Sequence, residues 1–124
     1  MRKAVRTSEA SAGDGPYSQA IVSGGFVFVS GQGPLDLEGR VVGDTIEEQT
    51  ALTLSNIERI LQAAGCSMDD VVKVNVILAD ISEFSRFNAV YRTYFQEPMP
   101  ARTCFEGGLD QIRVEIDVIA KSRD

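Results

Sequence analysis

The chain has 124 residues, of which 44% are hydrophobic, and a formal net charge of −6. This length predicts one domain over residues 1–124, large enough to bury a core. The acidic balance argues against nucleic acid as the main partner, because phosphate binding needs a basic surface. No apolar run reaches the roughly 18 residues of a membrane span, and no signal peptide follows Met1, so we expect a cytoplasmic protein without a membrane partner.

The sequence contains no histidine and only two cysteines, Cys66 and Cys104. The absence of histidine excludes a Ser-His-Asp triad, a Cys-His dyad and histidine-ligated zinc. Two thiols are too few for a zinc site built mainly from thiolates, so we expect no metal. Proton transfer would fall to carboxylates, tyrosine, lysine, cysteine or water.

The first 45 residues are predicted to be rich in β-structure and loops. Residues 1–14 are polar, with room for one short strand. A hairpin is predicted over residues 19–30, because two apolar runs flank Gly24-Gly25 and glycines permit the positive φ of a tight turn. A loop is expected over residues 31–39, followed by a short strand or bridge at Val41-Val42.

A helix is predicted over residues 46–64. Thr45 and Glu48 have the spacing of a capping box, and Gly65 lies where a helix stops. Its apolar stripe comprises Ile46, Thr50, Leu54, Ile57, Leu61 and Ala64.

The second half alternates strands and a helix. Residues 71–79 are predicted as a strand that turns Val72, Val74, Val76 and Leu78 to one face. A helix is predicted over residues 82–95, and Pro98 and Pro100 end it. Its apolar stripe, expected to face the core, comprises Phe84, Phe87, Tyr91, Tyr94 and Phe95. The last two strands are predicted at 101–106 and 113–120.

This order of elements predicts an α+β domain, with one mixed sheet and two helices packed on one of its faces. In the last strand Val114, Ile116, Val118 and Ala120 alternate with Arg113, Glu115, Asp117 and Ile119. The second set is too mixed for plain solvent and too polar for a core. Association between subunits over that face is therefore expected, with clefts at its edges.

Arg102 is the first candidate for a functional residue. It lies at the start of a predicted strand, just after the prolines that end the preceding helix. A guanidinium group matches a carboxylate in two parallel hydrogen bonds, although a surface salt bridge is the alternative interpretation. Glu115 could orient water or move a proton, or form an ion pair with Arg113 or Lys73. Cys104 shares a strand face with Arg102 but has no basic partner, so a small buried residue is favoured over a nucleophile.

Eight segments together resemble the RidA (YjgF-type) family of reactive-intermediate deaminases. They cover nearly the whole chain and are Gly15-Pro16-Tyr17-Ser18-Gln19, Val29-Ser30-Gly31-Gln32, Glu48-Gln49-Thr50 with Leu54, Asn56 and Ile57, Ala63-Ala64-Gly65, Asp70-Val71-Val72-Lys73, Phe87-Asn88 with Val90-Tyr91 and Tyr94-Phe95, Pro100-Ala101-Arg102-Thr103, and Val114-Glu115-Ile116 with Ile119-Ala120. One departure is the stretch between Arg102 and the last strand, which is shorter than in many members and contains Gly107-Gly108 in place of a Leu-Pro pair. The rim of the cleft is expected to differ accordingly.

The resemblance implies a chorismate-mutase-like fold and a homotrimer whose sheets line a central barrel, with a cleft at each subunit boundary. It also implies cofactor-free hydrolysis of enamine and imine acids such as 2-aminoacrylate to 2-keto acids and ammonia. Arg102 would bind the carboxylate of this small-molecule substrate, and Glu115 would help to place water. The matches at Tyr17, Ser30, Gly31, Asn88 and Cys104 would line the cleft.

Two other functions remain open from the sequence. A non-catalytic module that binds small carboxylates, or a chaperone-like partner, would use the same arginine. RNA cleavage, attributed to some relatives, fits less well with the acidic balance, the missing histidine and the lack of a basic stripe.

Overall fold

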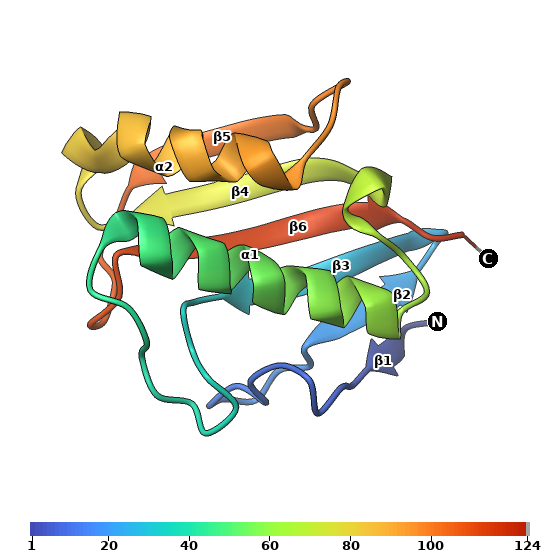
Figure 1. Cartoon of the computed structure of the whole chain (residues 1–124). Helices are drawn as coiled ribbons and strands as arrows, with labels where there is room; N and C mark the ends of the chain where they lie inside the picture. The colour runs from blue at the N-terminus through green and yellow to red at the C-terminus, as the bar shows by residue number, and fades with distance from the viewer. Residues whose placement is uncertain (124) are drawn as a thin grey trace.

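The computed structural model describes residues 1–123 and consists of one mixed six-stranded sheet with both α-helices on the same face (Figure 1). The strand order is β1-β2-β3-β6-β4-β5. Neighbouring strands are antiparallel, apart from the parallel pair β4 and β5. The strands are β1 (Lys3–Val5), β2 (Ala20–Ser23), β3 (Phe26–Gln32), β4 (Val71–Leu78), β5 (Ala101–Glu106) and β6 (Val114–Lys121). The α+β prediction is confirmed.

The hairpin predicted near the N-terminus is formed by β2 and β3. Gly24 and Gly25 make its turn with φ of 62° and 84°, a backbone that side chains disfavour and glycine tolerates. Strand β3 continues to Gln32, two residues beyond the predicted end, with a register shift after Val29. The expected bridge is present between Leu35 and Val41.

Helix α1 (Ile46–Ala63) confirms the first helix prediction and its capping box. The Thr45 hydroxyl accepts a hydrogen bond from the Glu48 amide, and the Glu48 carboxylate accepts one from the Thr45 amide, each at 3.1 Å. The buried side of α1 also carries Asn56, whose side-chain amide donates to the carbonyls of Gly33 and Leu35 at 3.2 and 3.0 Å. These bonds fix the loop after β3 against the helix.

The second predicted helix is shorter than the sequence indicated. Helix α2 covers only Phe84–Tyr91, and 3₁₀ turns flank it at Ile81–Glu83 (η2) and Arg92–Tyr94 (η3). The Asp80 side chain caps the first turn by accepting from the Ser82 amide at 2.9 Å, so the chain enters the helix through a tighter coil. The placement of Phe84 in the core was wrong: its side chain is 37% exposed, whereas Phe87 is fully buried.

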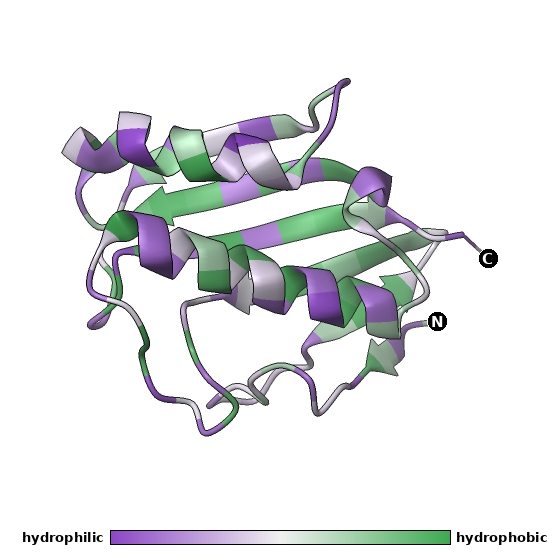
Figure 2. Ribbon diagram, viewed as in Figure 1, coloured by the Kyte–Doolittle hydropathy of each residue, from purple (hydrophilic) through white to green (hydrophobic). Residues whose placement is uncertain are grey.

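The core lies between the helices and one face of the sheet. Hydrophobic residues are concentrated on the central strands, while α1 carries both hydrophobic and hydrophilic residues (Figure 2). The alternation in β6 is confirmed, but β4 contains a register shift between Val71 and Lys73. Val71 is consequently buried and Val72 is 45% exposed, the reverse of the sequence prediction.

The other face of the sheet is not covered by a helix (Figure 1). It presents an alternation of apolar and polar side chains that are exposed or half-buried in one chain. They include Phe26, Phe28, Lys73, Asn75, Ile77, Thr103, Phe105, Glu115, Asp117 and Ile119. We refer to this surface as the open face. Within residues 1–123, no helix is both long and apolar enough to traverse a bilayer.

Candidate active site

Arg102 lies on edge strand β5, on the side of the sheet that the helices cover. Its pairing with the buried Val74 of β4 sets this orientation, because directly paired residues point to the same face. The guanidinium carbon lies 4.7 Å from the ring centroid of Tyr91, and 5.5 and 5.7 Å from those of Phe84 and Phe87. Three aromatic rings of α2 therefore support the cation by cation–π contact.

Asn88 fixes the direction of the Arg102 fork. Its side-chain oxygen accepts a hydrogen bond from Nη1 of Arg102 at 2.8 Å. Nε and Nη2 make no hydrogen bond to any residue between 1 and 123, and no carboxylate in that range pairs with the guanidinium. The alternative interpretation of Arg102 as a surface salt bridge is therefore not supported in the described chain. Two donors remain for an external acid group.

A pocket of about 330 Å³ opens beside this arginine. It is lined by Asn88, Tyr91, Arg92, Met99, Pro100 and Arg102. We call it the arginine pocket. It combines an apolar wall with a few polar groups, as ligand sites usually do.

Cys104 and Tyr91 lie near the cation but are neutral groups. Burial raises the pKa of the Cys104 thiol, and the Arg102 charge opposes that shift only in part. Burial likewise raises the pKa of Tyr91, whose hydroxyl is buried without a hydrogen-bond partner among the described residues. A raised pKa disfavours the thiolate, which is the nucleophilic form of cysteine, and the role of Cys104 stays a prediction.

Glu115 and Gly31 form a second group of predicted residues, on the open face. A side chain at Gly31 would place its Cβ 2.7 Å from Glu115 Oε2, so the carboxylate lies directly against the Gly31 backbone. Ser30 donates from its hydroxyl to the carbonyl of Ser18 at 2.6 Å, which ties β3 to the loop that carries Tyr17. Tyr17 is 46% exposed and its hydroxyl contacts Asp14.

Glu115 has no ion-pair or hydrogen-bond partner in residues 1–123, so the predicted alternatives with Arg113 and Lys73 do not form. Arg113 pairs with Glu83, and Lys73 donates to Thr103. Burial raises the pKa of Glu115, and the nearby Asp117 carboxylate adds to the effect. Glu115 therefore holds its proton to a higher pH than an ordinary glutamate does.

One chain does not bring Arg102 and Glu115 together. Arg102 is level with Val118 of β6, three residues from Glu115, and β4 separates the two strands. These offsets put the two Cα atoms about 14 Å apart, with side chains on opposite faces of the sheet. The predicted residues form two half-sites. Asn88, Arg102 and Cys104 lie on the helix side, and Glu115 lies against Gly31 on the open face, with Ser30 next to Gly31 and Tyr17 on the loop that Ser30 contacts.

Sequence reasoning missed the role of α2 in supporting the arginine. Phe84, Phe87 and Tyr91 were assigned to the core by their helical spacing, and the sequence offered no reason to consider Arg92. The i, i+3 and i+4 relation among Phe84, Phe87, Asn88 and Tyr91 was the available signal, because it puts all four on neighbouring helix positions. A search of residues 1–123 finds no group of three or more His, Cys, Asp or Glu side chains that could hold a metal ion.

The architecture is that of L-PSP/YjgF-type proteins. The solved structure of a putative endoribonuclease from Thermotoga maritima superposes with a TM-score of 0.93 at 42% sequence identity, and the match covers 100% of both chains. Such agreement over the full sheet and both helices defines the class of fold.

The sequence comparison is equally extensive. The family model described as Endoribonuclease L-PSP matches residues 7–122. The chain belongs to this family, which is the YjgF/RidA family. A RutC family protein of Pyrococcus horikoshii is 43% identical over 97% of this chain and 98% of its own length. A Bos taurus protein named 2-iminobutanoate/2-iminopropanoate deaminase is 42% identical over 97% of this chain and 90% of its own.

Proposed function

We propose that this protein hydrolyses reactive enamine and imine acids, of the 2-aminoacrylate and 2-iminopropionate type, to 2-keto acids and ammonia. The observation that carries the proposal is the Arg102 guanidinium, which is oriented by Asn88, lacks an acidic partner in the described chain and keeps two donors beside a pocket. The naming of mammalian relatives at about 42% identity as imine deaminases supports the same reaction class.

The complete site would form between copies of the chain. One copy would present Arg102, and a neighbour would present Gly31 and Glu115 from its open face, with Ser30 and Tyr17 from the adjoining strand and loop. The mixed apolar and polar character of the open face supports such association. In a homotrimer with the sheets inside, each copy would contribute to one complete site with each neighbour. This arrangement resolves the separation of the two half-sites within one chain.

The chemistry needs few groups. Arg102 binds the substrate carboxylate and holds the molecule in place. An enamine first gains a proton at carbon and loses one from nitrogen to become the imine, and the oxygen of water then adds to the C=N carbon. Glu115 accepts a proton from that water and passes it to nitrogen, which gives a carbinolamine. It then takes the hydroxyl proton and returns it to the amine, so that the C–N bond breaks as the C=O bond forms and ammonia and the keto acid are released. The raised pKa of Glu115 suits this exchange.

The direct test generates 2-aminoacrylate in situ with a dehydratase and follows keto-acid formation with and without the protein. Arg102→Ala is expected to remove the acceleration, whereas Cys104→Ala is expected to retain much of it. Glu115→Gln should lose turnover while still binding the keto-acid product, which separates an enzyme from a carboxylate-binding module. Unchanged keto-acid formation at every concentration of wild-type protein would refute the proposal for that substrate.

A further inference from the structure

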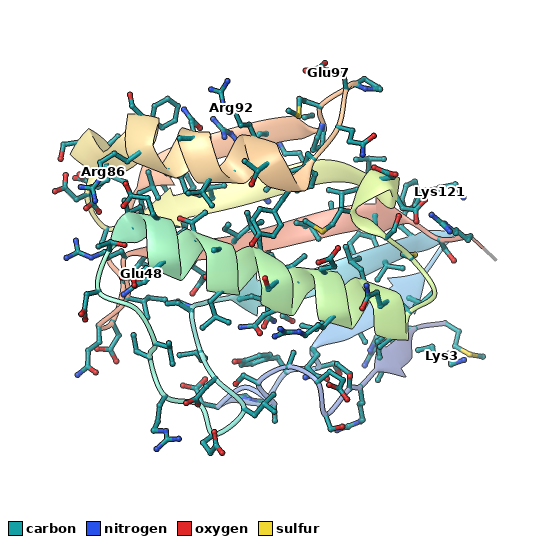
Figure 3. The ribbon with its side chains drawn as sticks, in the orientation of Figure 1. Lys3, Glu48, Arg86, Arg92, Glu97 and Lys121 are labelled. Carbon is teal, nitrogen blue, oxygen red and sulfur yellow. The ribbon has the colours of Figure 1, made fainter. Side chains whose placement is uncertain are left out.

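The arginine pocket contains a second cation that the proposed reaction does not require. Arg92 begins the η3 turn directly after α2 and lines the pocket together with Arg102. Its Nε donates to the main-chain carbonyl of Asn88 at 3.4 Å, while the Asn88 side chain holds Arg102 at 2.8 Å. One residue thus contacts both guanidinium groups. Figure 3 labels Arg92 beside the C-terminal part of α2, near strand β5.

Neither cation is neutralised by the described chain. Arg40, Arg86, Arg113 and Arg123 each have a carboxylate within ion-pair distance. Among residues 1–123, Arg92 and Arg102 have none, like Arg2, Arg6 and Arg59, but only Arg92 and Arg102 line one pocket together. Two like charges beside one pocket repel each other, and an anion between them relieves that repulsion.

We infer that the preferred substrates are dicarboxylic imine or enamine acids, an inference that rests on the proposed function. Arg102 binds the carboxylate next to the reacting carbon, and Arg92 binds a second carboxylate at the far end of the molecule. Met99 and Pro100 supply apolar wall for the methylene groups between them. A pocket of about 330 Å³ has room for a chain of four or five carbons.

The test compares two five-carbon imines that differ only at the far end. An amino-acid oxidase generates 2-iminoglutarate from glutamate and 2-iminopentanoate from norvaline, and keto-acid formation is measured for each. The wild-type protein is expected to have the higher kcat/KM for the dicarboxylate. Arg92→Gln should lower that value about tenfold, the effect of losing one charge-assisted hydrogen bond. It should leave the monocarboxylate within about twofold.

Arg2→Gln is the matched control. Arg2 is exposed and precedes β1, at the opposite edge of the sheet from β5, so its loss removes the same charge without touching the pocket. Both kcat/KM values are expected to stay at wild-type level. A common electrostatic effect of net charge would instead lower the dicarboxylate value in both variants, and that result overturns the inference.

A binding measurement keeps this inference separate from the proposed function. Calorimetry with the stable products 2-oxoglutarate and 2-oxopentanoate should show tighter binding of the former, with the difference lost in Arg92→Gln. That readout does not depend on turnover. Equal affinities in the wild type, or dissociation of the oligomer by Arg92→Gln, would show that Arg92 serves another purpose. Absence of catalysis with either imine would refute the deaminase proposal alone.

Discussion

If the active site is shared between copies, two inactive variants should restore each other. Arg102→Ala removes one half-site and Glu115→Gln removes the other, on opposite faces of the sheet. In an oligomer assembled at random from equal amounts of both, a site has an intact arginine from one copy with a probability of one half. It has an intact glutamate from the neighbour with the same probability, so about a quarter of the sites are complete.

The assay co-expresses the two variants with different affinity tags and purifies oligomers that carry both. Keto-acid formation from 2-aminoacrylate is then compared with the wild type and with each variant alone. Selecting mixed oligomers raises the complete fraction slightly above a quarter. A matched control pairs Arg102→Ala with the double variant Arg102→Ala/Glu115→Gln, which contains no intact arginine and should stay inactive. Mixed oligomers no more active than the single variants would refute a site divided between copies.

Three further outcomes follow from the packing. Gly31→Ala should lower kcat about as much as Glu115→Gln, because the new Cβ would lie 2.7 Å from Glu115 Oε2. A Cβ at Gly108 would have no atom within 4 Å, so Gly108→Ala should leave kcat unchanged. Equal losses of kcat in both glycine variants would contradict this reasoning. Asn56→Ala should lower the free energy of unfolding, measured by urea denaturation, by about 2 kcal/mol, because two loop carbonyls lose their hydrogen-bond donor. A loss below about 0.5 kcal/mol would show that water replaces the amide as donor. The folded state binds the Glu115 proton more tightly than the unfolded chain, whose glutamate pKa is near 4.5, so stability falls as pH rises above that value. Glu115→Gln should therefore raise Tm at about pH 7 and lose this advantage near pH 4, as measured by calorimetry; the same gain at both pH values excludes titration of Glu115 as the cause.

The sequence predicted the elements well where local patterns are sufficient. The capping box at Thr45 and Glu48 fixes the start of α1, and the glycine pair at 24–25 fixes the hairpin turn. The exposure of Val72 was not predictable in this way. A β-bulge depends on the pairing of β4 with β6, and residues 71–79 alone contain no signal for it.

The identity of the candidate site residues was easier to predict than their arrangement. Alternation in β6 showed that Glu115 and Ile116 point to opposite faces, but it could not say on which face Arg102 would lie. That depends on β5 joining β4 in parallel, with Arg102 opposite Val74. The support of Arg102 by Tyr91 was missed for the same reason, because core packing and cation–π contact require the same aromatic spacing on a helix.

If the active site forms between copies, placing its groups on the two faces of one sheet would make activity depend on protein concentration. A monomer would in that case be folded but lack a complete site, so dissociation would remove activity without unfolding the chain. Specific activity should then decline as the protein is diluted, while spectroscopic signs of structure stay constant. Cells could regulate such a protein through its concentration alone, with no separate inhibitor.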